Sequence, residues 1–242
     1  MTAERWAWRI LCAAALLLLA WGIAGMDWAR VAPSSVFLLQ ALGTSWLLAL
    51  VSMVTGGLAA VPLAGLRVYG GRWPSAAATL VIEAVRVTPE LMIVFWVYFA
   101  GPVLSGSRVT AWSAALWALG LIAASHLAEV IRGGLLSVPS GQSEGAAALG
   151  LTWLQAFRLV VLPQALRNMA PALMAQFVGL FKTTSLVYAI GVMEFFRAVS
   201  VTNNAIYDPY PLYTLLAAGY FVSCWAITRV IRWLDPAYEV VE

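Results

Sequence analysis

The sequence has few of the residues that cover a soluble protein or build an active site. Only 10% of its 242 residues are charged, whereas 62% are hydrophobic. A soluble domain uses about 25% charged residues to cover its surface. Most of this chain's surface must therefore face lipid. The composition predicts an all-α integral membrane protein, since a helix satisfies its own backbone hydrogen bonds in lipid.

The scarcity of particular residues excludes several kinds of site. The chain has one histidine, His126, and two cysteines, Cys12 and Cys224, which both lie in apolar runs. Neither a multi-histidine site nor a C-x-x-C metal site can be built from them. The single lysine, Lys182, follows Phe181, whereas a phosphate-binding loop needs a Gly-Lys pair. A net charge of +3 with scattered arginines does not indicate a nucleic-acid partner. We therefore expect no metal and no cofactor in this chain.

Long apolar runs predict about six spans, each of about 20 residues. The candidate spans are 10–25, 36–66, 75–101, 111–131, 164–190 and 211–231. With the N-terminus inside, arginines are concentrated on the cytoplasmic flanks, as the positive-inside rule requires. The cytoplasmic arginines are Arg5, Arg9, Arg67, Arg72, Arg132, Arg158, Arg167, Arg229 and Arg232, against Arg30, Arg108 and Arg197 outside. The predicted topology is N-in and C-in.

The first span has features of both a signal peptide and a retained anchor. Arg5 and Arg9 precede its apolar core, but no clear Ala-x-Ala-like cleavage site follows. We favour a retained anchor. Residues 1–35 then form the anchor with an external loop, and residues 36–242 form the main transmembrane domain.

The cytoplasmic segment at about 134–163 carries helix stop and start signals. Pro139 and Gly141 end the preceding helix, Ser140 is a candidate N-cap, and Glu144 would suit the dipole of a first helical turn. Gly150 is placed as the residue just after the C-cap. These signals predict a first short helix.

A second short helix is predicted directly afterwards. Thr152 and Gln155 match the S/T-x-x-Q capping box, and Pro163 suits the start of a further helix. The small residues 145–148 leave one helix face nearly bare. The segment is therefore either a loop packed on its own bundle or a protruding unit that fits a partner's groove.

The same segment resembles the EAA motif of ATP-binding-cassette (ABC) importer permeases. Glu144, Ala146 and Gly150 match the pattern E-x-A-x-x-x-G. The Leu-Pro pair that accompanies this motif stands later in the chain, at Leu162-Pro163. The stretches "VRVTPELMIVFWVYF", "AEVIRGGLLSVPS" and "FKTTSLVYAIGVMEFFRAVS" resemble the histidine/glutamine/glutamate-aspartate permeases, and "TSLVY…FFR" resembles the glutamate/aspartate type. The resemblance covers about residues 38–235.

The resemblance implies a type I ABC importer permease fold, a five-helix core to which residues 10–25 add one N-terminal helix. It implies a multi-pass subunit of the bacterial inner membrane that moves polar amino acids by alternating access and is not itself an enzyme. The implied partners are an ATPase dimer that holds ATP and magnesium, a second permease subunit and an extracytoplasmic solute-binding protein. The residues implied to couple this chain to the ATPase are Gln142, Glu144, Gly145, Ala146, Gly150, Leu162 and Pro163.

Three positions depart from the family pattern. Gly145 stands where the family has alanine, and Glu90 where it usually has an apolar residue. Ser125-His126-Leu127 stands where the family usually shows an aromatic residue before an Ala-Glu pair. The presence of Glu90 affects the expected substrate more than the expected coupling of this chain to the ATPase.

Ionisable residues at membrane depth cost roughly 2.5–3.5 kcal/mol each on insertion scales, so they mark function unless they are paired. The spacing of Glu83, Arg86 and Glu90 places them on one face of a continuous helix. They form either an ion-pair ladder or, beside a kink at Thr88-Pro89, a site where Arg86 meets a substrate carboxylate.

A second polar group lies near the outer end of the span 164–190. The hydroxyls of Thr183, Thr184 and Ser185 compete for backbone partners and predict a helix break, as in the discontinuous helices of transporters. Lys182 either snorkels to the headgroups or lines the path, and Gln176 lies deeper. The predicted substrate path comprises Arg86, Thr88, Pro89, Glu90, Gln176, Lys182, Thr183, Thr184 and Ser185.

The remaining membrane charges have a simpler interpretation. We expect Glu129 and Arg132 to pair with each other at the cytoplasmic boundary, with His126 one turn earlier.

Other classes of protein fit the sequence less well. A membrane enzyme would need converging acid, base, nucleophile or metal ligands. A passive channel or scaffold would not need the cytoplasmic helix pair. The sequence therefore favours an importer permease for polar amino acids, with the acidic ones as candidate substrates and another small polar or zwitterionic solute as the alternative.

Overall fold

The computed structural model describes residues 22–106 and 108–234, and residues 10–21 of the predicted anchor lie outside this range. Its regular elements in that range are all helical. They are α2 (Trp28–Val31), η1 (Ala32–Ser34), α3 (Ser35–Tyr69), α4 (Arg72–Val87), α5 (Glu90–Ser105), α6 (Ala111–Leu136), α7 (Ser140–Ala148), α8 (Trp153–Ala156), η2 (Phe157–Val161), α9 (Leu162–Thr183), η3 (Thr184–Ile190), α10 (Phe195–Ile206) and α11 (Pro209–Leu234).

Four helical stretches of the described chain are long and apolar enough to cross a membrane. They are Trp28–Tyr69, Ala111–Leu136, Trp153–Ile190 and Pro209–Val230. The predicted spans 36–66, 111–131, 164–190 and 211–231 fall within these four stretches or extend one residue beyond them. The prediction of an all-helical membrane protein is confirmed.

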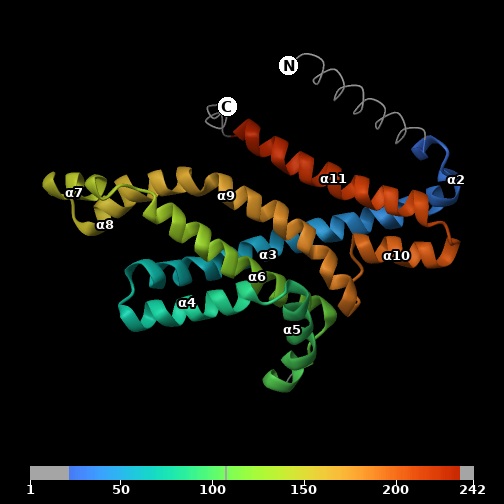
Figure 1. The fold of residues 1–242 in the computed structure, drawn as a ribbon, viewed down its shortest axis with the longest axis horizontal. Coiled ribbons are helices and arrows are strands. Elements are labelled where there is room, and N and C mark those ends of the chain that lie inside the picture. The colour runs from blue at the N-terminus through green and yellow to red at the C-terminus, as the bar shows by residue number, and fades with distance from the viewer. Residues whose placement is uncertain (1–21, 107, 235–242) are drawn as a thin grey trace, which may run out of the picture.

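The predicted span 75–101 is wrong as a single helix. It consists of α4 and α5, separated at Thr88, whose backbone is extended at φ −82° and ψ 133°. Proline disfavours the helical conformation in the residue before it, and Pro89 has no N–H for the helix ladder. Figure 1 shows α5 leaving α4 at a steep angle. Each helix has 16 residues, or about 24 Å, which is less than the roughly 30 Å of a bilayer core.

Helix α6 forms the centre of the bundle, packed along α3 and also against α4, α5 and α9. Its buried face is made mostly of alanine, and small residues let membrane helices approach closely. The closest approach is at Gly56 of α3, where an added Cβ would lie 2.5 Å from the Cβ of Ala123 and 2.8 Å from the carbonyl oxygen of Gly120. The contact between α3 and α6 therefore depends on a glycine at this position.

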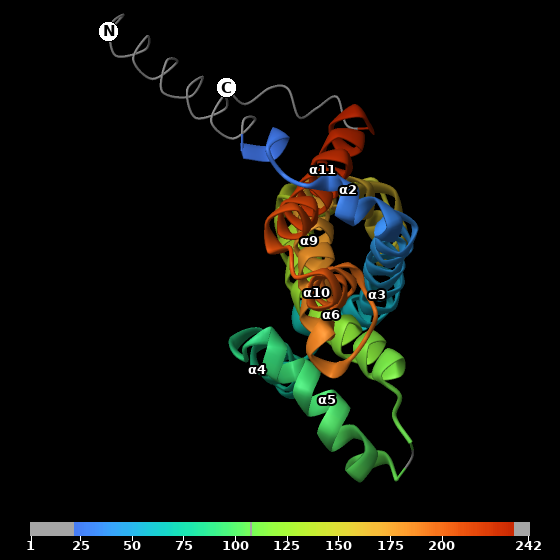
Figure 2. The ribbon, with the colours of Figure 1, turned by 90° about the vertical axis from the view of Figure 1, so that its right-hand side faces the viewer.

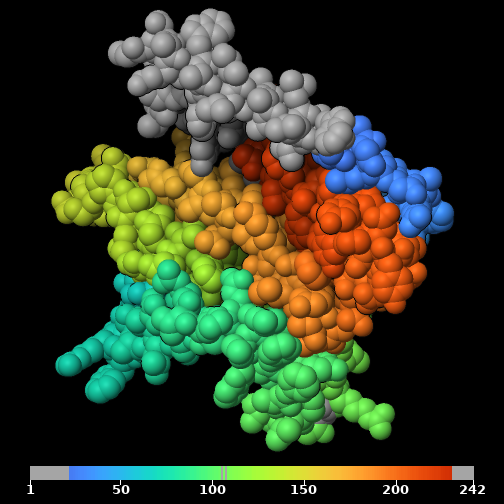
Figure 3. All heavy atoms as spheres, turned by 45° about the vertical axis from the view of Figure 1, so that its right-hand side comes forward, coloured from blue at the N-terminus to red at the C-terminus, as the bar shows by residue number. Residues whose placement is uncertain are grey.

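The two ends of the bundle carry different short helices. Figure 1 places α7, α8 and the α3–α4 turn at one end and α2 and α10 at the other, and Figure 2 shows α2 and α10 at the end that faces the viewer. At the first end Glu129 of α6 accepts hydrogen bonds from Arg132 and from Arg67 of α3. The predicted Glu129–Arg132 pair is confirmed, and Arg67 extends it across two helices. Figure 3 shows α5 and the loop after it projecting from the body of the molecule.

Candidate functional site

The first short helix of the segment 134–163, α7, ends as its sequence predicts. Gly150 adopts a left-handed conformation with φ +80°, which a glycine reaches without steric cost. The N–H of Gly150 bonds the carbonyl of Ala147 at 2.9 Å, and the N–H of Leu151 bonds that of Ala146 at 3.1 Å. This pair of bonds is a Schellman motif, so the turn out of α7 has a defined geometry.

The start of α7 differs from the prediction. Pro139 is the N-cap residue, and no side chain caps this end. Ser140 is instead the first helical residue, and its carbonyl accepts a bond from the hydroxyl of Ser143. Glu144 consequently lies beyond the first turn, so the predicted capping role of Ser140 and dipole role of Glu144 are wrong. Both side chains are exposed.

The second helix, α8, opens with the predicted capping box. The N–H of Thr152 donates to Oε1 of Gln155 at 2.9 Å, and the N–H of Gln155 donates to the Thr152 hydroxyl at 3.4 Å. The five residues of η2 that follow are π-helical. They stand directly before Leu162 and Pro163, where the missing proline N–H prevents an unbroken α-helical ladder. α8, η2 and α9 thereby follow one another with no intervening loop.

Side chains attach this pair of helices to the spans. The rings of Trp153 and Phe157 are stacked at 5.6 Å, and Tyr69 at the end of α3 meets Trp153 edge-on, also at 5.6 Å. The amide of Gln164 on α9 lies 3.3 Å from Oε1 of Gln142 on α7. We call residues 140–156 the coupling unit.

The outer face of the coupling unit is open. Gly145 has no atom within 4 Å of the position that a Cβ would take, and Leu149 is 83% exposed. Ala146 is buried and packs toward the bundle, so the small-residue stretch 145–148 does not present a single bare face. The segment is partly packed on its own bundle and partly available to another chain.

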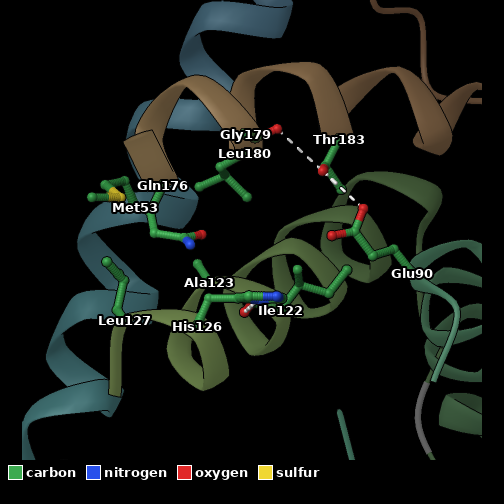
Figure 4. Close-up of a pocket in the computed structure, with 10 residues that line it drawn as sticks. All are labelled: Met53, Glu90, Ile122, Ala123, His126, Leu127, Gln176, Gly179, Leu180 and Thr183. Atoms are coloured by element: carbon green, nitrogen blue, oxygen red, sulfur yellow. Dashed lines mark hydrogen bonds between the residues drawn. The ribbon is translucent and has the colours of Figure 1, made fainter. Parts of the chain in front are cut away.

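The other end of α9 reaches an intramembrane cavity of about 70 Å³. Figure 4 shows side chains from α3, α5, α6 and α9 around it. Its lining residues are Met53, Glu90, Ile122, Ala123, His126, Leu127, Gln176, Gly179, Leu180 and Thr183. The share of liquid volume taken by one water is about 30 Å³. In this conformation the cavity therefore has room for a few water molecules or for a polar group of similar size.

Glu90 and Thr183 bring two predicted path segments together. The hydroxyl of Thr183 donates to Oε2 of Glu90 at 2.9 Å, and lies 3.2 Å from the carbonyl of Gly179 (Figure 4). Because Glu90 begins α5, it does not share a helix face with Glu83 and Arg86. The predicted three-residue ladder across Pro89 is therefore wrong.

The other predicted path residues lie apart from the cavity. Arg86 pairs with Glu83 at 3.1 Å, as the ion-pair alternative predicted, and Lys182 is exposed. Thr184 and Ser185 bond the carbonyls of Phe181 and Lys182.

The helix at this end changes form where the hydroxyls predict it. At Thr184, α9 gives way to the 3-10 helix η3.

The two predicted path residues at the α4–α5 junction also lie outside the cavity lining. The hydroxyl of Thr88 donates to the carbonyl of Ala84, and Pro89 is the N-cap residue of α5. Of the nine predicted path residues, Glu90, Gln176 and Thr183 line the cavity.

His126 was expected near Glu129 and Arg132, yet it lines the cavity. Its Nδ1 lies 2.9 Å from the carbonyl of Ile122, and Glu129 is bonded to the two arginines instead. The one signal in the sequence was the departure from an aromatic residue at this position. The packing of α6 between α3 and α9 decides which way the side chain points, and no local pattern encodes that.

Glu194 is a second residue that the sequence patterns did not single out. Its carboxylate is fully buried and accepts bonds from the backbone N–H groups of Phe196 and Arg197, both at 2.8 Å. The hydroxyls of Ser45 on α3 and Tyr220 on α11 lie 3.4 Å from it. Glu194 therefore caps α10 and ties it to two spans. An acidic residue just before the helical "FFRAV" was the available signal.

These features together define a class of protein. The described chain is a helical membrane bundle with a projecting coupling unit and an internal polar cavity. Its sequence has no phosphate-binding loop. A helical membrane bundle of this kind fits a solute-transporting permease subunit.

The family is identified by comparison with known proteins. Residues 52–240 match the family described as "Binding-protein-dependent transport system inner membrane component". The chain belongs to this family. It is a transport subunit and not an enzyme, and the ATPase of such a system is a separate chain.

Individual relatives match most of the chain. It is 31% identical to the glutamate/aspartate import permease protein GltK of Escherichia coli O157:H7, over 86% of this chain and 96% of that protein. It is 31% identical to the glutamine transport system permease protein GlnP of Escherichia coli K12, over 89% and 99%. A crystal structure of an amino acid ABC transporter with histidines superposes with a TM-score of 0.81 at 26% identity, over 88% and 99%. The fold is that of a type I ABC importer permease.

Proposed function

We propose that this chain is the permease subunit of an ATP-driven importer for polar amino acids in the bacterial inner membrane. The substrates named for the relatives, glutamate/aspartate and glutamine, support an amino acid. The family description supports an inner-membrane location and a separate binding protein. Another small polar or zwitterionic solute is the alternative.

Helix α9 is the observation that carries this proposal. It has 22 residues, or about 33 Å. Near its start, Gln164 contacts Gln142 of the coupling unit, and near its end Gln176 and Thr183 line the cavity. A displacement of the coupling unit is thereby transmitted to the cavity by one element, which is what alternating access requires.

The partners follow from the same arrangement. An ATPase dimer, holding ATP and magnesium, would bind the open face of the coupling unit around Glu144, Gly145 and Leu149. A second permease subunit would complete the pore, and an extracytoplasmic solute-binding protein would deliver the substrate. Gln142 and Gly150 would act in this scheme by holding the coupling unit in shape.

The proposal is tested by purification and reconstitution. The tagged chain, extracted from bacterial membranes, should bring an ATPase subunit with it. In proteoliposomes with the binding protein, the complex should take up a labelled amino acid only when ATP is supplied. Glu144→Arg should reduce this uptake at least tenfold while the complex stays monodisperse, because the charge on the open face is reversed.

Two results would contradict the proposal. One is a chain that purifies without any ATPase and supports no ATP-dependent uptake. The other is uptake by Glu144→Arg at the unmodified rate, which would remove the coupling role from this face. A matched control is Glu83→Gln, which lies outside the coupling unit and should leave the ATPase bound.

A further inference from the structure

The polar groups of the cavity are mostly hydrogen-bond acceptors. Among its ten lining residues are the Glu90 carboxylate, the Gln176 amide, the Thr183 hydroxyl and the His126 ring. The Thr183 hydroxyl donates to Glu90. None of the ten is an arginine or a lysine. A ligand that enters the cavity therefore meets the Glu90 carboxyl group, several other acceptors and the amide of Gln176, but no cationic side chain of the lining.

The bond at Nδ1 determines what His126 offers. A carbonyl oxygen only accepts hydrogen bonds, so the Nδ1 atom that lies 2.9 Å from the Ile122 carbonyl must carry a proton. In the neutral ring Nε2 is then a lone-pair acceptor. Nε2 is therefore the ring nitrogen that can bind a ligand, and it can accept a hydrogen bond from an N–H or O–H group.

Glu90 lacks a cationic partner in the described part of the chain. Its fellow acidic residues Glu83 and Glu129 are each in an ion pair with arginine, whereas Glu90 has the Thr183 hydroxyl. Charges inside a membrane protein are kept where a partner compensates them. A ligand cation would supply that partner.

We propose that Glu90 and His126 select a cationic amino-acid side chain, with its ammonium or guanidinium group seated in the cavity. This inference rests on the proposed function and replaces the acidic substrates that the resemblance suggested. An acidic side chain would place its carboxylate against that of Glu90. The cavity volume of about 70 Å³ suits the end group of a side chain. Gln176 and Thr183 complete the set of groups around it.

The test compares two ligands that differ in charge. Arginine and citrulline have nearly the same shape, but only arginine carries a guanidinium. We would measure equilibrium binding of labelled arginine, citrulline and glutamate to the permease–ATPase complex in lipid nanodiscs, without the binding protein. Arginine should bind at least tenfold more tightly than citrulline, and glutamate more weakly than both.

Matched variants separate charge selection from folding. Glu90→Gln keeps a carbonyl oxygen that can accept from Thr183, and it should reduce the arginine-to-citrulline ratio to about one. His126→Phe should weaken arginine binding at least threefold, whereas His126→Gln, which keeps an acceptor, should weaken it less. Glu83→Gln should leave the ratio unchanged, because Glu83 does not line the cavity.

The inference is overturned if the unmodified complex binds none of the three ligands, binds glutamate best, or keeps its ratio in Glu90→Gln. ATP-dependent uptake, measured on the same complex with its binding protein, reports on the proposed function separately. Uptake without charge selection would remove this inference and leave the permease assignment in place.

Discussion

The coupling unit and the intramembrane cavity are built by different kinds of contact. In the coupling unit, the Schellman motif at Gly150 and the capping box at Thr152 each join residues three to five positions apart. Around the cavity, Glu90 meets Thr183 across 93 positions of the chain. One region is specified by its neighbours in sequence, and the other by how whole helices pack.

This difference shows where each region can be damaged. A change in the coupling unit should act on two short helices and leave the spans folded. A change in the layer around the cavity should disturb several helices at once, because α3, α5, α6 and α9 all contribute to it. If substitutions in the two regions disturbed the same number of helices, this difference between the regions would be contradicted.

The largest effect is expected from Gly56→Ala. The added Cβ would meet the Ala123 Cβ at 2.5 Å and backbone atoms of α6 below 3 Å, so α3 and α6 must separate. Overpacking of this kind costs about 1–3 kcal/mol. The unfolding temperature of the purified complex in detergent should fall.

Gly65→Ala is the matched control on the same helix, since nothing lies within 4 Å of its Cβ position. Alanine is favoured over glycine in a helix by about 1 kcal/mol, so this variant should be as stable as the unmodified protein or more so. Equal unfolding temperatures for the two variants would contradict the close α3–α6 contact.

A smaller and local effect is expected from Thr152→Ala. The substitution removes both side-chain bonds of the capping box, a loss of about 1 kcal/mol. Amide hydrogen exchange should become faster in residues 153–161 and stay unchanged in residues 176–183. Thr152→Ser keeps a capping hydroxyl and should exchange like the unmodified protein. Equally faster exchange around the cavity would show that the two regions are not separable.

The smallest effect is expected from Arg86→Ala. Arg86 is exposed, pairs with Glu83 and does not line the cavity. Exposed ion pairs contribute about 0–1 kcal/mol. ATP-dependent uptake should stay within about twofold of the unmodified rate. A tenfold loss would return Arg86 to the substrate path.

The sequence predicted what local physics determines. Apolar length placed four spans, Gly150 and Thr152 placed the turn and start of the coupling unit, and the hydroxyls at Thr183–Ser185 placed the change from α9 to η3. The family resemblance, confirmed by comparison, supplied the transport role.

The prediction was wrong where distant contacts decide. Glu83, Arg86 and Glu90 have helical spacing, but Pro89 breaks the helix between them. Glu90 bonds Thr183 on α9, His126 lines the cavity, and Glu129 pairs with Arg67 of α3 as well as with Arg132. The spacing of residues along the sequence does not determine these contacts, because they form only when the spans pack.

The central claim is that the coupling unit converts ATPase motion into opening of the cavity, and Gly150→Val tests it most directly. Valine is strained at φ +80°, so the turn between α7 and α8 must change. The measurement is binding-protein-stimulated ATP hydrolysis in proteoliposomes, with Gly133→Ala as the control, since Gly133 lies outside the coupling unit and nothing lies within 4 Å of its Cβ position. The account predicts at least a tenfold loss for Gly150→Val and normal stimulation for Gly133→Ala, and normal stimulation in both variants would contradict it.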